Sequence, residues 1–141
     1  MSLFRIMDIA GSALSAQSMR LNTTASNMAN ADSVSSSIEQ TYRARHPVFA
    51  TMMDDMMMSF EGESVGTGVK VSGVIESKAP VQSEYRPDHP MADENGYIHM
   101  PNVNMVEEMA NMMSAQRSYQ MNIEVANACK TLMQQTLQLG A

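Results

Sequence analysis

Residues 3–31 read LFRIMDIAGSALSAQSMRLNTTASNMANA, and apolar residues recur along this stretch in alternating steps of four and three. This spacing, with no proline to interrupt it, predicts a long helix with a coiled-coil seam. The seam comprises Leu3, Met7, Ala10, Leu14, Gln17, Leu21, Thr24, Met28 and Ala31. The polar members Gln17 and Thr24 either select the register of helix pairing or lie at a wetter edge.

A second apolar row widens the face of this helix beyond a two-strand seam. The row comprises Ile6, Ile9, Ala13 and Ala16. An apolar face of this width predicts that the helix contacts more than one neighbour.

The segment from Val103 to about Leu139 repeats the four-and-three spacing and predicts a second long helix. Its seam comprises Met105, Met109, Met112, Gln116, Tyr119, Ile123, Ala126, Lys130, Met133 and Leu137. Pro101 marks the start, Asn102 and Asn104 are two candidate N-caps, and Gly140 marks the exit.

The residues between the helices have a different composition. A strand is predicted over residues 68–77, where Val69, Val71 and Ile75 alternate with polar residues and Gly73 is a candidate bulge. Residues 42–49, around Pro47, suggest an extended edge segment.

Weaker strand signals occur at 81–85 and 97–100, and Asn95–Gly96 predicts a turn. Residues 51–60 are compatible with either a short helix or a loop. The resulting fold class is mainly α with a small β-rich insertion, in which the terminal helices form an antiparallel, coiled-coil-like pair. We expect residues 1–31 and 103–141 to form one discontinuous helical domain, with 32–102 inserted between them.

The helices carry more apolar surface than one partner covers, yet too few large side chains to offset the entropy of ordering them. We therefore expect the terminal segments to be largely disordered in the free chain and to become helical on assembly. The 17 methionines fit either an adaptable contact surface or an ordinary core in which methionine replaces leucine.

Charge and hydropathy exclude several partner classes. The net charge is −6 and no block of Lys or Arg occurs, which argues against nucleic acid. No stretch approaches the roughly 18 apolar residues that span a bilayer. Residues 1–10 contain Arg5 and no signal-peptide core, so we expect no cleaved signal.

The candidate phosphate and metal motifs have simpler interpretations. Gly66-Thr67-Gly68 lacks the third glycine of a nucleotide fingerprint and predicts a turn. His46, His89 and His99 have no carboxylate or Cys partner at ligand spacing, so no metal or cofactor is predicted.

No nucleophile or acid–base pair stands out either. Asp54–Asp55 and Glu107–Glu108 are adjacent pairs, whose members diverge on a helix. Cys129, the only cysteine, is predicted to be a small buried thiol. We therefore predict no catalytic residue and no enzymatic activity.

Two stretches resemble a known family. Residues 25–33, ASNMANADS, resemble the N-terminal signature of flagellar axial proteins, in which Asn27 and Asn30 can close the helix by bonding their own backbone. Residues 93–109, DENGYIHMPNVNMVEEM, resemble the start of the C-terminal helix in proximal rod proteins of the FlgC type. The match continues through 115–120 and 130–133.

The resemblance implies a structural subunit of the basal-body rod, which crosses the periplasm between the inner-membrane ring and the hook. It implies export by the flagellar type III apparatus and a tubular hetero-oligomer of this chain with other rod subunits, with the helix pairs around a central channel. The expected assembly residues are Leu3, Met7, Leu14, Leu21, Asn27, Met28, Asn30, Met105, Met109, Met112, Tyr119, Ile123, Met133 and Leu137.

Two other functions fit the same helices. One is another flagellar axial subunit of the rod or hook, against which residues 95–109 argue. The other is a cytoplasmic adaptor or chaperone that dimerises through its heptads, which would form discrete folded oligomers by itself.

Overall fold

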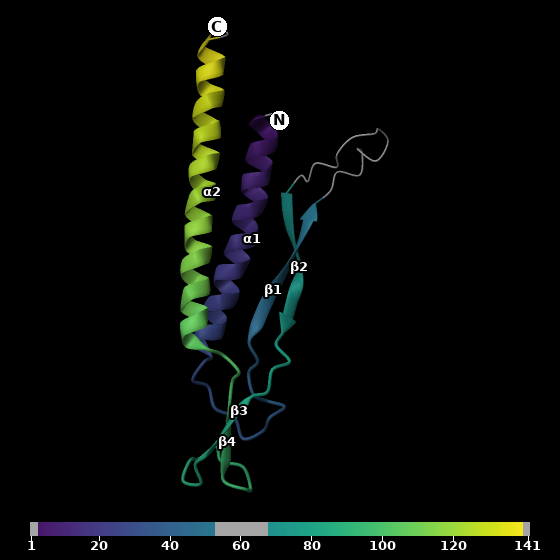
Figure 1. The fold of residues 1–141 in the computed structure, drawn as a ribbon, viewed down its shortest axis with the longest axis vertical. Helices are drawn as coiled ribbons and strands as arrows, with labels where there is room; N and C mark the ends of the chain where they lie inside the picture. The colour runs from purple at the N-terminus through teal and green to yellow at the C-terminus, as the bar shows by residue number, and fades with distance from the viewer. Residues whose placement is uncertain (1–2, 53–67, 140–141) are drawn as a thin grey trace, which may run out of the picture.

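The computed structural model describes residues 3–52 and 68–139. Its elements follow the order α1 (Leu3–Ala29), β1 (Arg45–Met52), β2 (Gly68–Glu76), β3 (Gln82–Tyr85), β4 (Tyr97–Met100) and α2 (Met105–Leu139). The two helices lie side by side and run in opposite directions, with the β3–β4 hairpin beyond their lower ends (Figure 1). The predicted class, mainly α with a small β-rich insertion, is confirmed. Most of the segment 51–60 lies outside the described residues; Thr51 and Met52 end β1.

β1 and β2 form an antiparallel two-stranded sheet, which we call the β1–β2 ribbon. Val48 pairs with Gly73 and Phe49 with Val71, so Ser72 is an extra residue on β2. The ribbon is irregular at this point, next to the glycine that the sequence marks as a candidate bulge. Pro47 lies in β1. Both strands of a two-stranded sheet are edge strands, so a residue without an N–H is tolerated there.

β3 and β4 form a second antiparallel pair, joined by residues 86–96, which end in a turn over 93–96. Gly96 adopts a φ of 78°, which an added Cβ would make unfavourable. Asp93 fixes the turn, because its Oδ1 accepts the N–H groups of Asn95 and Tyr97, both at 2.8 Å.

The helix ends use three asparagines in different ways. Asn104 caps α2, since its Oδ1 accepts the Val106 N–H at 3.0 Å. Asn102 is not a cap, because its amide is bonded elsewhere. At the end of α1, Asn30 donates to the carbonyl of Ser26 at 2.8 Å, which confirms the predicted local closure.

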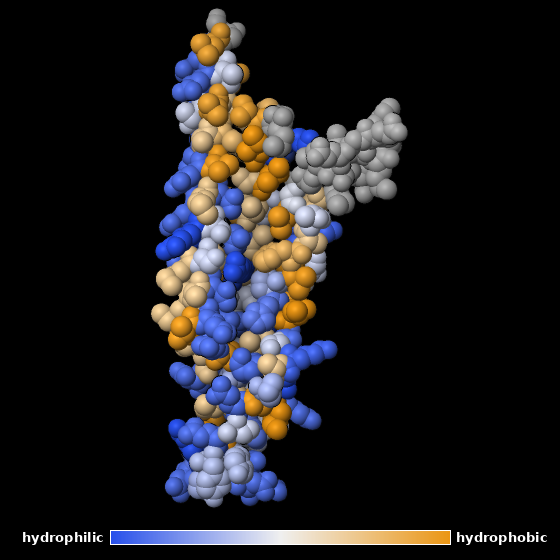
Figure 2. All heavy atoms as spheres, in the orientation of Figure 1, coloured by the Kyte–Doolittle hydropathy of each residue, from blue (hydrophilic) through white to orange (hydrophobic). Residues whose placement is uncertain are grey.

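The core is small and is made of short side chains. Among the described residues, the buried apolar ones are Ala10, Ala16, Ala44, Ile98, Ala115 and Cys129. Large apolar residues instead reach the surface along the helices and the ribbon (Figure 2). An isolated subunit with this distribution leaves much of its apolar surface in water.

Candidate assembly interface

The two helices pair through small residues. Arg20 on α1 donates to the side-chain carbonyl of Asn111 on α2 at 3.2 Å, which defines the register of the pair. One turn farther along, Ala16 and Ala115 are both buried, and Ala115 is 0% exposed. Short side chains at this level let the two helix backbones approach closely.

The pair is staggered. Leu3 lies 17 residues before Arg20, whereas Leu139 lies 28 residues after Asn111. α2 therefore continues for about 11 residues beyond the start of α1, or about 16 Å at the helical rise. Figure 1 shows the upper end of α2 extending past α1 without a neighbouring element. We call residues 130–139, which follow the buried Cys129, the overhang. Leu132, Leu137 and Leu139 are exposed on it, and Leu137 is 74% exposed.

α1 has a second neighbour within its own chain, the β1–β2 ribbon. The Ser12 hydroxyl accepts the Val69 N–H at 3.1 Å and donates to the Ile9 carbonyl at 2.8 Å. Gly68 lies so close that a Cβ built on it would be 2.5 Å from Ser12 Oγ. The sequence predicts more than one neighbour for the wide apolar face of α1. The ribbon of the same chain is one of these neighbours and covers part of that face.

A buried asparagine connects α1 to the start of the ribbon. Asn27 is 1% exposed; its Nδ2 donates to the Arg45 carbonyl, and its Oδ1 accepts the Arg45 N–H, both at 2.9 Å. The Tyr42 hydroxyl donates to the same Oδ1 at 2.9 Å. The prediction that Asn27 bonds the backbone of its own helix end is wrong, because the β1 strand offers it two unpaired backbone groups.

A second asparagine connects the ribbon to the approach to α2. Asn102 Oδ1 accepts the Ala44 N–H at 2.8 Å, and its Nδ2 donates to the Ala79 carbonyl at 2.9 Å. Ala44, which precedes β1, and Arg45, its first residue, are therefore held by two amides, one in α1 and one shortly before α2. Sequence reasoning treated Asn102 only as a candidate cap. It missed these two bonds because the partners, Ala44 and Ala79, lie 58 and 23 residues away in the sequence.

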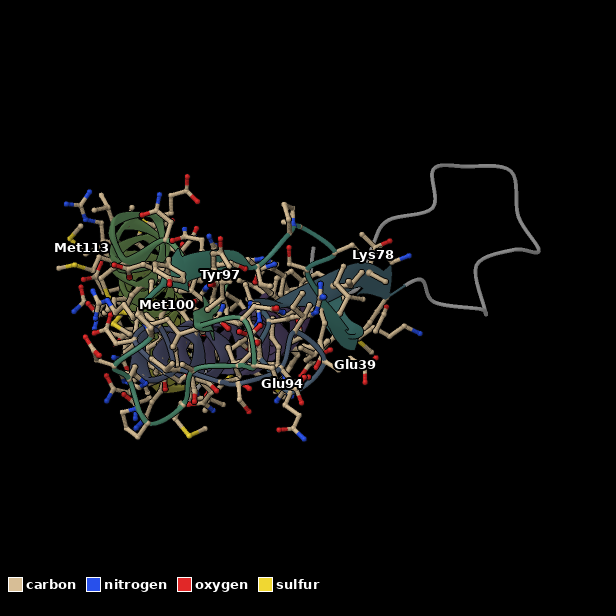
Figure 3. All side chains as sticks on the ribbon, turned by 90° about the horizontal axis from the view of Figure 1, so that it is seen from below. Glu39, Lys78, Glu94, Tyr97, Met100 and Met113 are labelled. Atoms are coloured by element: carbon tan, nitrogen blue, oxygen red, sulfur yellow. The ribbon has the colours of Figure 1, made fainter. Side chains whose placement is uncertain are left out.

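The face of α2 that points away from α1 carries a row of exposed apolar residues. Val106 is 74% exposed, Met113 is 55% exposed, and Met121 is also exposed. Met113 projects outward from the helix pair in Figure 3. A shallow groove of about 350 Å³ runs beside this row, lined by Ala110, Met113, Ser114, Arg117, Ser118 and Met121.

Cys129 and the Glu107–Glu108 pair lie 21 or more residues apart on α2 and share no site. Cys129 is a buried, unpaired thiol, as predicted. Glu108 is buried while Glu107 is exposed, so the two diverge. Asp54–Asp55 and Gly66–Thr67 lie outside the described residues.

His99 corrects one prediction, because it does have a carboxylate neighbour. Its Nε2 lies 3.7 Å from Asp93 Oδ2, and its Nδ1 is 2.9 Å from Ser83 Oγ. The pKa of Asp93 lies below its ordinary value of 3.8, chiefly because the Tyr97 N–H donates to it; partial desolvation opposes this shift. Sequence reasoning missed the pair because a turn brings the two residues together.

Two further features bear on partners. Among residues 3–52 and 68–139, no three His, Cys, Asp or Glu side chains cluster as a metal site would require. Neither α1 nor α2 combines the length and apolarity needed to cross a membrane.

Comparison with known proteins shows the family of the chain. The family described as "Flagella basal body rod protein" matches residues 7–35, and "Flagellar basal body rod FlgEFG protein C-terminal" matches residues 94–139. A flagellar basal-body rod protein FlgC from Salmonella typhimurium is 55% identical over 140 residues, which cover 99% of both chains. The chain belongs to the FlgC family.

Other FlgC proteins are similar along their whole length. The Escherichia coli protein is 54% identical over 99% of both chains, and that of Borreliella burgdorferi is 31% identical over 97% of both. Membership in the FlgC family makes this chain a structural subunit of the basal-body rod and not an enzyme.

The residues expected at the FlgC assembly interface differ in their accessibility. Four are exposed, namely Met7, Met109, Ile123 and Leu137. Nine are half-buried, namely Leu3, Leu14, Leu21, Met28, Asn30, Met105, Met112, Tyr119 and Met133. Only Asn27 is buried, and its amide is fully engaged with Arg45 and Tyr42.

Proposed function

We propose that this FlgC-family chain is a proximal rod subunit whose α1–α2 pair packs, in coiled-coil fashion, against pairs from neighbouring subunits in a tubular assembly. The observation that carries the proposal is the outward row on α2, where Val106, Met113 and Met121 are exposed although the helix is already paired. A helix that is apolar on more than one face is typical of an interior position. The neighbours are other rod subunits and further copies of this chain.

Assembly would supply the burial that the isolated chain lacks. The small core favours a free chain that is only partly helical, which also suits export by the flagellar type III apparatus as an unfolded chain. The 14 residues expected at the interface remain its proposed members. Asn27 would act indirectly, by fixing the ribbon against α1.

The division of labour follows the two parts of the chain. Residues 1–31 and 103–141 would form the tube, the drive shaft and the wall of an export channel between the inner-membrane ring and the hook. Residues 32–102 would form an insertion on that tube. Paired helices suit the transmission of torque because many contacts along their length share the load.

A charge on the outward row tests the interface. Val106→Asp leaves the isolated fold intact, because the side chain is exposed and an acidic residue in the first turn favours the helix. In a deletion strain, this variant should fail to restore hooks and motility. The matched control is Val106→Met, which keeps an exposed apolar side chain at the same position of α2 and should complement normally.

Two outcomes would contradict the proposal. One is hook formation in the deletion strain itself, counted by electron microscopy of basal bodies. The other is a discrete, fully folded dimer of the purified chain, which would favour the adaptor function. Normal motility with Val106→Asp would remove the outward row of α2 from the interface.

A further inference from the structure

The β1–β2 ribbon contacts α1 near both of its own ends. At its base, Asn27 holds the N–H and the carbonyl of Arg45. At its far end, Ser12 accepts the Val69 N–H at 3.1 Å. Ser12 and Asn27 lie 15 residues apart, so these bonds bracket about four turns of α1.

The contact between these two points is close. Ala16 and Thr23 lie on the same side of α1 as Ser12 and Asn27, and both are less than one-tenth exposed. Gly68 meets Ser12 with no room for a side chain and has a φ of 154°. The bracketed turns therefore have one neighbour in α2 and another in the ribbon.

Other helical turns lack this double support. Phe4 and Met7, before Ser12, are exposed, and Phe4 is 70% exposed. The overhang of α2 likewise carries exposed leucines at 132, 137 and 139. Helical turns without tertiary packing are marginal in water.

We infer that the β1–β2 ribbon is a template that keeps residues 12–29 of α1 helical in the free chain, so that neighbours order only the remaining turns. Asn102 extends this coupling toward α2, because it holds Ala44 beside the residue that Asn27 holds. The inference deepens the proposed function. It rests on that function in one respect, namely that neighbouring rod subunits cover the first turns of α1 and the overhang. The ribbon and residues 12–29 of α1 would fold as one cooperative unit.

Hydrogen–deuterium exchange of the purified full-length chain at micromolar concentration tests the template directly. Peptides within 13–29 and within β1 and β2 should exchange slowly, while peptides within 3–9 and 130–139 exchange fast. Even exchange along the whole of α1, fast or slow, would overturn the inference. The measurement needs no rod, so a failure of assembly in cells would leave its result unaffected.

Two glycines of β2 provide matched variants. Gly68→Ala drives a Cβ into Ser12 and should raise exchange in peptides within 13–29 at least about fivefold, the factor of one net hydrogen bond. Gly73→Ala, in the same strand, meets no atom within 4 Å and should leave α1 unchanged. Equal effects of the two substitutions would contradict the template.

Ser12→Ala covers the case in which Gly68→Ala unfolds the chain. Alanine is the better helix former, so an isolated helix would be stabilised by this change. The template instead requires exchange within 13–29 to rise about fivefold, because the Val69 N–H loses its acceptor. Exchange in this variant equal to or slower than that of the unmodified chain would overturn the inference.

Discussion

The amide of Asn27 bonds both backbone groups of Arg45, so the last turn of α1 takes the place of a neighbouring strand at the start of β1. Arg45 faces Glu76 on its other side, where the two side chains form an ion pair at 3.1 Å. A strand edge that would otherwise be open is thereby closed by a side chain.

Replacing Asn27 should therefore cost more than a typical helix substitution. Asn27→Ala removes three hydrogen bonds of about 0.5–1.5 kcal/mol each, so we expect urea unfolding to show a loss of about 2–4 kcal/mol. Asn22→Ala, at an exposed position on the same helix, should change stability by less than about 0.5 kcal/mol. Equal losses in the two variants would show that the Asn27 bonds do not stabilise the fold.

Gln17 should be replaceable with a gain in stability. Within the described residues its Oε1 is buried and has no hydrogen-bond partner. Gln17→Met keeps the size of the side chain and removes the unsatisfied group, so the free chain should gain about 1–2 kcal/mol in urea unfolding. Gln120→Met, at an exposed site, serves as the control with no expected gain. A loss of stability in Gln17→Met would mean that this oxygen has a partner in solution.

The turn at Asp93 should loosen in acid. Because the pKa of Asp93 is lowered in the folded chain, chiefly by the Tyr97 N–H, its contribution to stability is complete above 3.8. The contribution is lost as the pH falls below 3.8 through the folded pKa. NMR should show the Tyr97 amide moving toward its unfolded shift over this range, whereas Asp93→Asn should show no such titration. The same titration in both proteins would assign it to another group.

The free chain should contain less helix than the described fold. The 27 residues of α1 and the 35 of α2 make up 62 of the 141 residues. Far-ultraviolet circular dichroism at micromolar concentration should give a clearly smaller helical fraction, because the unsupported turns fray. A value matching all 62 residues would contradict folding on assembly.

Removing the overhang should separate folding from assembly. Deletion of residues 130–141 takes away turns that no described element of the chain covers. We expect the free energy of unfolding of the free chain to change by less than about 1 kcal/mol, while hooks are no longer built in cells. Truncated protein that still restores motility would show that the overhang has no part in the rod.

Periodicity predicted the main elements well. The four-and-three spacing anticipated α1 and α2, whose described bounds are Leu3–Ala29 and Met105–Leu139. Alternation around Val69 and Val71 lies within β2, Gly68–Glu76. These signals are local, and each depends on residues that are close in the sequence.

The contacts between elements were beyond such reasoning. An amide that bonds a distant backbone leaves no pattern at its partner, so Asn27–Arg45 and Asn102–Ala44 had no signal in Arg45 or Ala44. The burial of individual side chains along α1 within the subunit was also beyond such reasoning. Large residues such as Leu14 and Leu21 are only half-buried, whereas Ala16 and Thr23 are buried because α2 and the ribbon converge there. The row of small residues Ser12, Ala16 and Thr23 was the available clue to a second close neighbour.

The stagger of the helix pair has a mechanical consequence. Because α2 runs about 16 Å past α1, the upper end of the subunit is a step and not a flat surface. Subunits stacked along their helices would overlap at each junction, because the end of α2 in one subunit would extend alongside the next. No single plane would then separate one layer of subunits from the next. A twisting force would be resisted by helix backbones as well as by the contacts between side chains.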